Sequence, residues 1–286
     1  MKKLVLCKCA SGKDVDSCCS QNTRVWLQPV KRPDEHEELL KKVKISSEFN
    51  LRYRGLFEFY GTDLITYKLG NPTCKSRNQF LEVLGLYFTV YLEDECPESW
   101  EACQASFWEE FLFTFYPNHI ELSPNETEVG AIFIELKKFT YWLDKRTGSS
   151  TYRLIENFIQ ESASELKQCE KLINRLFNSV FSRIHHNDWD YNTDIQQNNQ
   201  QLEECKETKR TIFEVTQMNG KIVELTALDS HVAYLVKDLP YEIMAPNTLL
   251  SGLIGRKNGD RFWVFNFPES AYPKRAKKFL ENIIFW

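Results

Sequence analysis

The sequence has no long apolar run, no large excess of one charge and no local catalytic signature. Its longest apolar stretches, such as residues 131–134, fall far short of the roughly 20 residues that span a bilayer, so we expect no membrane insertion. The net charge of −4 argues against a nucleic-acid coat protein. With 286 residues, 42% hydrophobic and 14% aromatic, the chain nevertheless has enough apolar surface to fold, which excludes disorder throughout.

Charge is distributed unevenly along the chain. Residues 1–33 carry seven basic and two acidic side chains (+5), residues 34–208 carry 18 and 30 (−12), and residues 209–286 carry 11 and 8 (+3). The two basic ends are therefore where we expect contact with phosphates or acidic proteins.

The acidic middle has the apolar spacing of α-helices. In residues 76–93 the apolar side chains recur at intervals of three and four, which places them on one helix face. Similar patterns predict helices over 34–43, 51–69, 98–116 and 150–184. Another helix is expected after Ser123, which can cap it, with Pro124 in the first position, Glu126 closing a capping box and Gly148 as the stop.

The last third of the chain changes character twice. Residues 187–208 are rich in Asn and Gln, which predicts a polar linker or helical extension. Beyond them the apolar period becomes two, in short β-branched and aromatic runs at 212–215, 222–225, 232–236, 249–254 and 262–265. Five short strands bury a face best as a small curled barrel or sandwich. A final helix is expected over 274–284.

Four of the nine cysteines lie close together near the start of the chain: Cys7, Cys9, Cys18 and Cys19. Zn²⁺ prefers four thiolate or imidazole ligands in a tetrahedron, and a short peptide supplies them by folding around the ion. Exposed free thiols and two disulfides are the alternatives. Clustered cysteines in a reducing compartment are more often metal ligands than disulfides, so we predict Zn²⁺ as the cofactor.

Residues 6–19 resemble the SEC-C motif, whose usual form is Cys-Pro-Cys-Gly-Ser-Gly-Lys, a few mostly basic residues with one Tyr, and then Cys with Cys or His. The resemblance rests on the ligand spacing and on Ser11-Gly12-Lys13. It implies a zinc knuckle with Cys7, Cys9, Cys18 and Cys19 as ligands. In the translocation motor SecA, the same element docks a chaperone and ribosomes.

Several positions depart from the usual motif. Lys8 stands where Pro is usual and Ala10 where Gly is usual, and Asp14 and Asp16 lie among the customary basic positions, which weakens the comparison with the basic contact surface of the usual motif. The chain has no Gly-x4-Gly-Lys-Ser/Thr phosphate loop, which excludes a translocation ATPase. Residues 107–146, followed by a small β-domain, are similar to uncharacterised prokaryotic proteins that carry SEC-C motifs.

The predicted fold class is α+β multidomain. It comprises an SEC-C-like zinc knuckle over residues 1–30, a mostly α-helical domain over 34–186, a polar linker or helical extension over 187–208, and a small β-barrel-like domain with a C-terminal helix over 209–286. The beginning of the chain resembles a lipoprotein signal only superficially, because its apolar stretch is limited to residues 4–6 where a signal peptide has about 7 to 15. We therefore expect a cytoplasmic protein.

Two polar patterns near residue 190 have simple explanations. Asp188, Asp190, Asn192 and Asp194 alternate as in a calcium loop, but no Gly or bidentate Glu follows at the required positions, so a polar linker is the favoured interpretation. His185 and His186 are expected at the end of the long helix, where cations suit the helix dipole.

A basic cluster adjoins the predicted β-domain and consists of Lys274, Arg275, Lys277 and Lys278. The neighbouring strands carry the aromatic residues Tyr234, Phe262, Trp263 and Phe265. Basic and aromatic side chains on a small barrel can bind single-stranded nucleic acid, although alternate positions of any small barrel must be apolar to fill its interior. Core packing is the favoured interpretation of the rings, and the basic residues are possible partner or nucleic-acid contacts.

These observations lead to one main hypothesis and two alternatives. The main hypothesis is a zinc-binding, non-catalytic interaction protein that docks an unknown protein or ribonucleoprotein partner through its basic ends. The first alternative is a single-stranded nucleic-acid-binding protein that acts through its C-terminal β-domain. The second is an enzyme whose site is assembled from distant residues, since no local Ser, Cys and His arrangement of a nucleophilic enzyme is recognisable.

Overall fold

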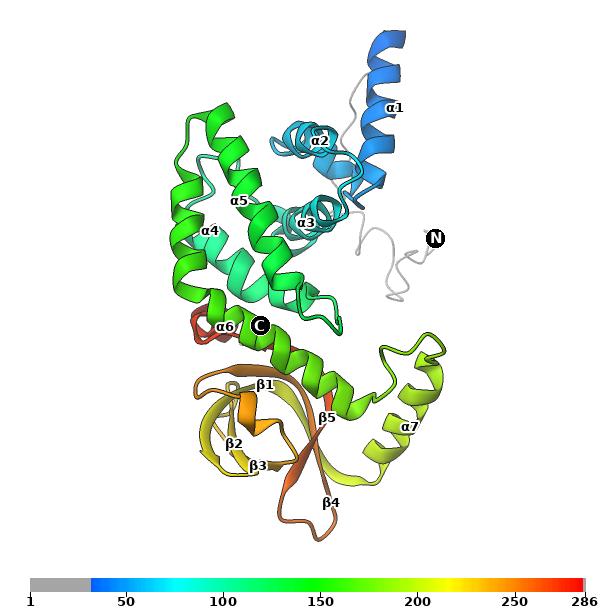
Figure 1. Ribbon diagram of the computed structural model, residues 1–286, viewed down its shortest axis with the longest axis vertical. Helices are drawn as coiled ribbons and strands as arrows, with labels where there is room; N and C mark the ends of the chain where they lie inside the picture. Colours follow the sequence, from blue (N-terminus) through cyan, green and yellow to red (C-terminus); the bar gives the residue numbers. More distant parts are fainter. Residues whose placement is uncertain (1–31, 285–286) are drawn as a thin grey trace, which may run out of the picture. The chain divides into compact units, whose positions relative to one another are not determined.

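The computed structural model describes residues 32–284 and combines eight α-helices with a five-stranded sheet in that part of the chain (Figure 1). Contacts divide the chain after residue 42, and residues 43–286 form one compact unit. The segments predicted as a helical domain over 34–186 and a β-domain over 209–286 therefore share a unit from Val43 onwards. No helix among the described residues is long and apolar enough to cross a membrane.

The helical part contains seven α-helices, several of which continue into tighter or wider turns. They are α1 (Pro33–Ser47), α2 (Gly61–Leu69), α3 (Lys75–Leu86) with a π-helical turn at Tyr87–Tyr91, α4 (Ala105–Glu110) with a π-helical turn at Phe111–Phe115, α5 (Glu128–Thr147), α6 (Thr151–Val180) and α7 (Tyr191–Glu203). The apolar stripe predicted over residues 76–93 is confirmed as buried, with Phe80, Leu84 and Phe88 fully enclosed.

The predicted helix over residues 98–116 is wrong in its first turns, because α4 begins only at Ala105. The side chain of Trp100 explains the difference. Its indole Nε1 donates a hydrogen bond to the Asp63 carboxylate (2.8 Å), and its ring packs edge-on against Phe59 and Phe88. These tertiary contacts fix Trp100 within the turns that precede Ala105.

The predicted start of the next helix is also wrong. Helix α5 begins at Glu128 rather than at Pro124, and Glu126 adopts a positive φ of 50° instead of closing a capping box. The buried carboxylate of Glu170, from α6, accepts hydrogen bonds from the backbone N–H groups of Glu128 (2.7 Å) and Val129 (3.3 Å). A distant residue thus caps α5 and replaces the local cap. The predicted stop at Gly148 is confirmed, with φ of 76°.

Helix α6 connects the other helices of residues 43–147 with the strands, and in Figure 1 it runs between α3–α5 and the strands. Ile155 and Leu166 belong to the core of the helical part. Leu172 and Leu176, six and ten residues after Leu166, belong to the core of the sheet. Because one continuous helix contributes to both cores, the two parts are packed together rather than separated by a linker.

The sheet consists of β1 (Cys205–Asn219), β2 (Ile222–Ala227), β3 (Ala233–Lys237), β4 (Leu249–Lys257) and β5 (Trp263–Tyr272). The strands close in the order β1-β2-β3-β5-β4, and all neighbours are antiparallel except β3 and β5. The parallel closure is short, pairing Val236 with Trp263 and Lys237 with Val264. Register shifts in β1 and β5 make the barrel irregular.

One of these irregularities depends on a glycine. At Gly252 of β4, an added Cβ would lie 2.4 Å from the carbonyl oxygen of Phe267 in β5. No side chain fits in that space, so the close approach of the two strands beside the register shift requires glycine. A 3₁₀ turn (Lys274–Ala276) and α8 (Lys277–Ile284) follow β5 and complete the described chain.

Candidate functional site

The predicted zinc ligands Cys7, Cys9, Cys18 and Cys19 lie outside the residues that the structure describes. The cysteines within the described part are free thiols at positions 74, 96, 103, 169 and 205. Within residues 32–284, no group of three or more His, Cys, Asp or Glu side chains could hold a metal ion. The described residues therefore add no ligand set that competes with the predicted cysteine tetrad.

The predicted basic cluster is largely paired with carboxylates. Arg275 contacts Glu161 of α6 (2.7 Å), and Lys278 contacts Glu109 of α4 (2.7 Å). Lys277 contacts Glu214 of β1, also at 2.7 Å. These cations join α8 and the preceding turn to the helical part and to the barrel, so much of their charge is neutralised within the molecule.

The aromatic residues beside that cluster mostly fill the barrel. Trp263 is 8% exposed and Phe265 is 6% exposed, and both belong to the barrel core. Tyr234 packs edge-on against Trp263 with ring centroids 5.0 Å apart. Bases could not stack on the enclosed rings of Trp263 and Phe265, whereas Tyr234 and Phe262 are half-buried.

The acidic residues near position 190 bond locally. Asp190 caps α7 by accepting a hydrogen bond from the backbone N–H of Asn192 (3.0 Å), and Asp188 pairs with Arg183. The helix-dipole explanation of His185 and His186 is wrong, because α6 ends at Val180. Phe181, directly after the helix, is buried and packs edge-on against Phe267 of β5, with ring centroids 5.9 Å apart.

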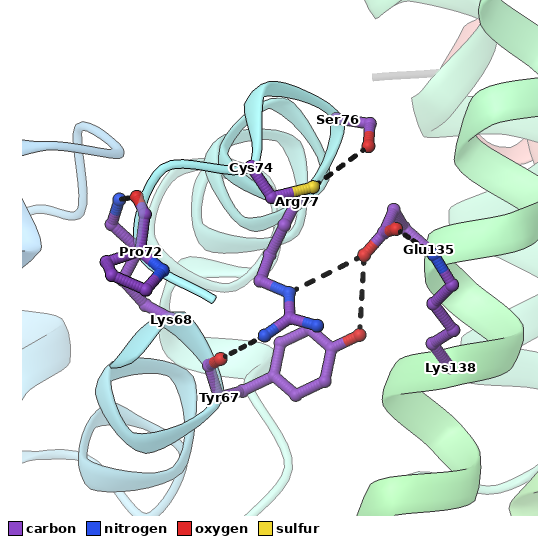
Figure 2. A network of polar contacts seen from close by, with 8 residues as sticks. All are labelled: Tyr67, Lys68, Pro72, Cys74, Ser76, Arg77, Glu135 and Lys138. Atoms are coloured by element: carbon purple, nitrogen blue, oxygen red, sulfur yellow. Dashed lines mark hydrogen bonds and ion pairs between the residues drawn. The ribbon is translucent and has the colours of Figure 1, made fainter. Parts of the chain in front are cut away.

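A buried polar cluster that the sequence analysis did not identify lies where α2, α3 and α5 meet (Figure 2). Its centre is Glu135 of α5, which is only 1% exposed. One carboxylate oxygen accepts a hydrogen bond from Lys138 Nζ (2.7 Å). The other accepts one from the Tyr67 hydroxyl (3.4 Å) and lies 3.6 Å from Arg77 Nε. Removing this carboxylate from water is costly, and the two hydrogen bonds and the ion pair with Arg77 offset that cost.

Arg77 is fixed by two further contacts. Its Nη1 donates a hydrogen bond to the backbone carbonyl of Tyr67 (2.8 Å), and its guanidinium lies 4.1 Å from the centroid of the Tyr67 ring. Figure 2 shows the guanidinium stacked on that ring and directed toward Glu135. A planar guanidinium held by a ring face, a carbonyl and a carboxylate has little freedom to move. Burial raises the pKa of the Tyr67 hydroxyl, which therefore remains a neutral donor.

Cys74 stands next to this cluster at the N-cap of α3. Its thiol lies 3.3 Å from the Ser76 hydroxyl, and the hydrogen bonds from Ser76 and the backbone of Arg77 lower its pKa. By contrast, burial raises the pKa of Cys96 to about 11. Among these two thiols, Cys74 is the more readily ionised.

Two cavities of opposite charge border α3 and α5. One, of about 200 Å³, has an acidic lining that includes Glu82, Glu121 and Glu128. Burial, and then the nearby Glu121 carboxylate, raise the pKa of Glu128. The other, of about 300 Å³, is lined by Arg77 and Lys138 beside aromatic rings.

Sequence patterns contained one signal for the buried cluster. Glu135 falls three residues after Ile132 and four before Phe139, so it lies within the apolar stripe of the helix. A charge on a buried face requires partners. Arg77 and Tyr67 could not be identified as those partners, because the packing of α2 and α3 against α5 is not readable from the sequence.

No family model matches the chain, and no curated protein or solved structure is similar to it.

Proposed function

We propose that the protein is a zinc-binding, non-catalytic interaction protein of the cytoplasm that docks a protein or ribonucleoprotein partner. Cys7, Cys9, Cys18 and Cys19 hold the ion in an SEC-C-like knuckle. The spacing Cys-x-Cys-x8-Cys-Cys carries the proposal, because it supplies a complete tetrahedral ligand set in a short peptide.

The pairing of the C-terminal cations favours docking over nucleic-acid binding. Nucleic-acid binding requires Lys and Arg side chains that are free to neutralise phosphates, because this releases the counterions condensed on the nucleic acid. In this protein Arg275, Lys277 and Lys278 each contact a carboxylate. In this proposal the barrel-like C-terminal domain therefore has a packing role, and the knuckle supplies the partner contact.

The zinc assignment is tested by metal analysis of the full chain purified without chelator. We expect about one zinc ion per chain, as in a four-ligand structural site, and a large loss of zinc in Cys18→Ser. Cys205→Ser is the matched control, since Cys205 lies in the described part, outside the predicted tetrad, and its Sγ donates a hydrogen bond to the carbonyl of Gln201. Zinc-free wild-type protein, or unchanged zinc in Cys18→Ser, would refute the proposal.

The docking function is tested by affinity capture with intact protein and with Cys7→Ser. A partner that depends on the knuckle should be lost from the Cys7→Ser capture and retained by Cys205→Ser. Capture before and after nuclease treatment distinguishes a protein partner from a ribonucleoprotein. Binding of a single-stranded oligonucleotide by the full chain that falls steeply with salt and persists in Cys7→Ser would instead favour the nucleic-acid alternative.

A further inference from the structure

The cavity beside the buried cluster has the composition of an anion site. It has a volume of about 300 Å³ and is lined by Thr66, Tyr67, Gly70, Arg77, Lys138 and Trp142. This volume is at the lower end of the range for small-molecule sites, about 300 to 1,000 Å³. Two of the lining residues are cationic and none is acidic.

The charge of the cluster remains positive after its internal ion pairs are counted. Arg77 and Lys138 each contribute one positive charge, and Glu135 is the one carboxylate paired with both. Glu135 is 1% exposed and does not line the cavity, so its charge lies beneath the cations. One excess positive charge therefore faces the cavity, shared between the guanidinium of a side chain that is 13% exposed and the ammonium of a side chain that is 55% exposed.

Both cations retain hydrogen-bond donors. Arg77 uses Nη1 for the carbonyl of Tyr67 and directs Nε toward Glu135, and its Nη2 has no partner among the described residues. Lys138 has three ammonium protons and one observed acceptor, Glu135. Its side chain is 55% exposed, so the ammonium can turn toward a ligand.

The shape of the cavity depends on Gly70 and on two rings. At Gly70 an added Cβ would lie 3.2 Å from Arg77 Nη1, so glycine leaves room for the guanidinium at this wall. The rings of Tyr67 and Trp142 lie 5.4 Å apart and form an apolar wall. A fixed guanidinium, a movable ammonium and an aromatic wall suit an oxyanion, since Arg presents parallel donors to carboxylate or phosphate oxygens.

We propose that this cavity binds an oxyanion, a carboxylate or phosphate group, between Arg77 and Lys138. The ion takes up the excess positive charge, accepts from Arg77 Nη2 and Lys138 Nζ, and packs against Trp142. The oxyanion belongs either to a free small ion or to a larger molecule that carries the group. The proposal concerns the helical part alone and does not depend on zinc binding by the N-terminal cysteines.

The test is isothermal titration of the full chain with inorganic phosphate and, separately, with phenyl phosphate. Lys138→Gln should weaken phosphate binding about tenfold, because it removes one charged donor. Lys137→Gln is the matched control: it makes the same change on the adjacent residue, whose ammonium pairs with Glu156 (3.2 Å) and does not line the cavity. The affinity of the Lys137→Gln variant for phosphate should differ from that of the wild type by less than about twofold.

A second variant keeps the charge and changes the geometry. Arg77→Lys retains one positive charge but loses the planar guanidinium, and should also weaken phosphate binding about tenfold. Circular dichroism and thermal melting establish that each variant is folded. If both probes bind, the natural ligand is a phosphate or carboxylate group carried on a larger molecule. If inorganic phosphate alone binds, the natural ligand is the free ion. No binding of either probe to the wild type, or equal weakening by Lys138→Gln and Lys137→Gln, would overturn the proposal.

Discussion

The helical part and the barrel are built from different cores and opposite charges. The helical core is crowded with aromatic rings, among which Tyr60 and Phe88 stack at 4.1 Å and Tyr87 contacts Phe107, Phe111 and Phe115. The barrel core is mainly aliphatic, as at Val223, Leu225 and Ile254. Residues 34–208 carry −12 and residues 209–286 carry +3.

Ion pairs join the two oppositely charged parts. Carboxylates of the helical part, Glu109 and Glu161, contact Lys278 and Arg275 beyond the last strand. The charge balance of the segments is thus partly explained by ion pairs within the chain, and an external partner of the basic end stays a prediction. An uneven distribution of charge along a chain can reflect ion pairs between the chain's own parts as well as contact with a partner.

The largest expected effect concerns the helix that both cores share. Leu172→Ala removes a fully buried side chain from the barrel core and should lower the free energy of unfolding by about 2 to 5 kcal/mol. Because α6 also packs in the helical core, far-UV circular dichroism and tryptophan fluorescence should report one common transition in urea.

The control for Leu172→Ala is Val232→Ala, at a side chain that is 48% exposed. It should change stability by less than about 0.5 kcal/mol. Two separate transitions, with only one of them shifted by Leu172→Ala, would show that the helical part and the barrel unfold independently.

The next largest effect tests the buried charge of the helical part. Glu135→Gln leaves Arg77 without its carboxylate and weakens the contacts of Lys138 and Tyr67. Loss of one partner from a fully buried pair costs about 3 to 5 kcal/mol. Arg77 retains 13% exposure and Lys138 retains 55%, so a smaller loss of about 2 kcal/mol is expected in urea denaturation.

The exposed carboxylate of Glu156 provides a comparison for Glu135. It pairs with Lys137 at 3.2 Å, with both side chains about one-third exposed. Glu156→Gln should cost about 1 kcal/mol or less. Equal losses for the two variants would contradict the assignment of Glu135 as the centre of the cluster.

A smaller effect is expected for the ion pairs between the two parts. Arg275→Ala removes the contact with Glu161 and the approach of the guanidinium to the Phe113 ring (5.5 Å). Partly exposed pairs contribute about 0.2 to 1 kcal/mol, so the loss should be within this range and should shrink at high salt. A loss above 2 kcal/mol would mean that charge, rather than α6, holds the two parts together.

The smallest effect concerns pH. Burial raises the pKa of Glu170 above its unfolded value. Its contribution to stability is therefore fully present below the unfolded pKa and is lost as pH rises through the folded pKa. The wild type should gain stability relative to Glu170→Gln as pH falls from 7 to 5. Urea denaturation of both proteins at the two pH values measures this difference, and a constant difference would exclude a raised pKa.

Local patterns in the sequence predicted most elements, because they depend on residues a few positions apart. The stripe of α3 and the alternation of the strands are read in this way. The start of α5 was mispredicted because Glu170, 42 residues away, caps it. The candidate site was missed for the same reason, since Tyr67, Arg77 and Glu135 meet only through tertiary packing. The zinc ligands remain a prediction from spacing.

The contacts between the barrel and the helical part also constrain the order in which the protein folds during its synthesis. Asn118, in the turn after α4, accepts hydrogen bonds from Ser270 and Tyr272, 152 and 154 residues later. Tyr272 and Leu280 also complete the helical core. The chain leaves the ribosome N-terminus first, so the helical core is completed only after residues 270–280 have been synthesised. Until then the helical core lacks two of the buried side chains that complete it, Tyr272 and Leu280.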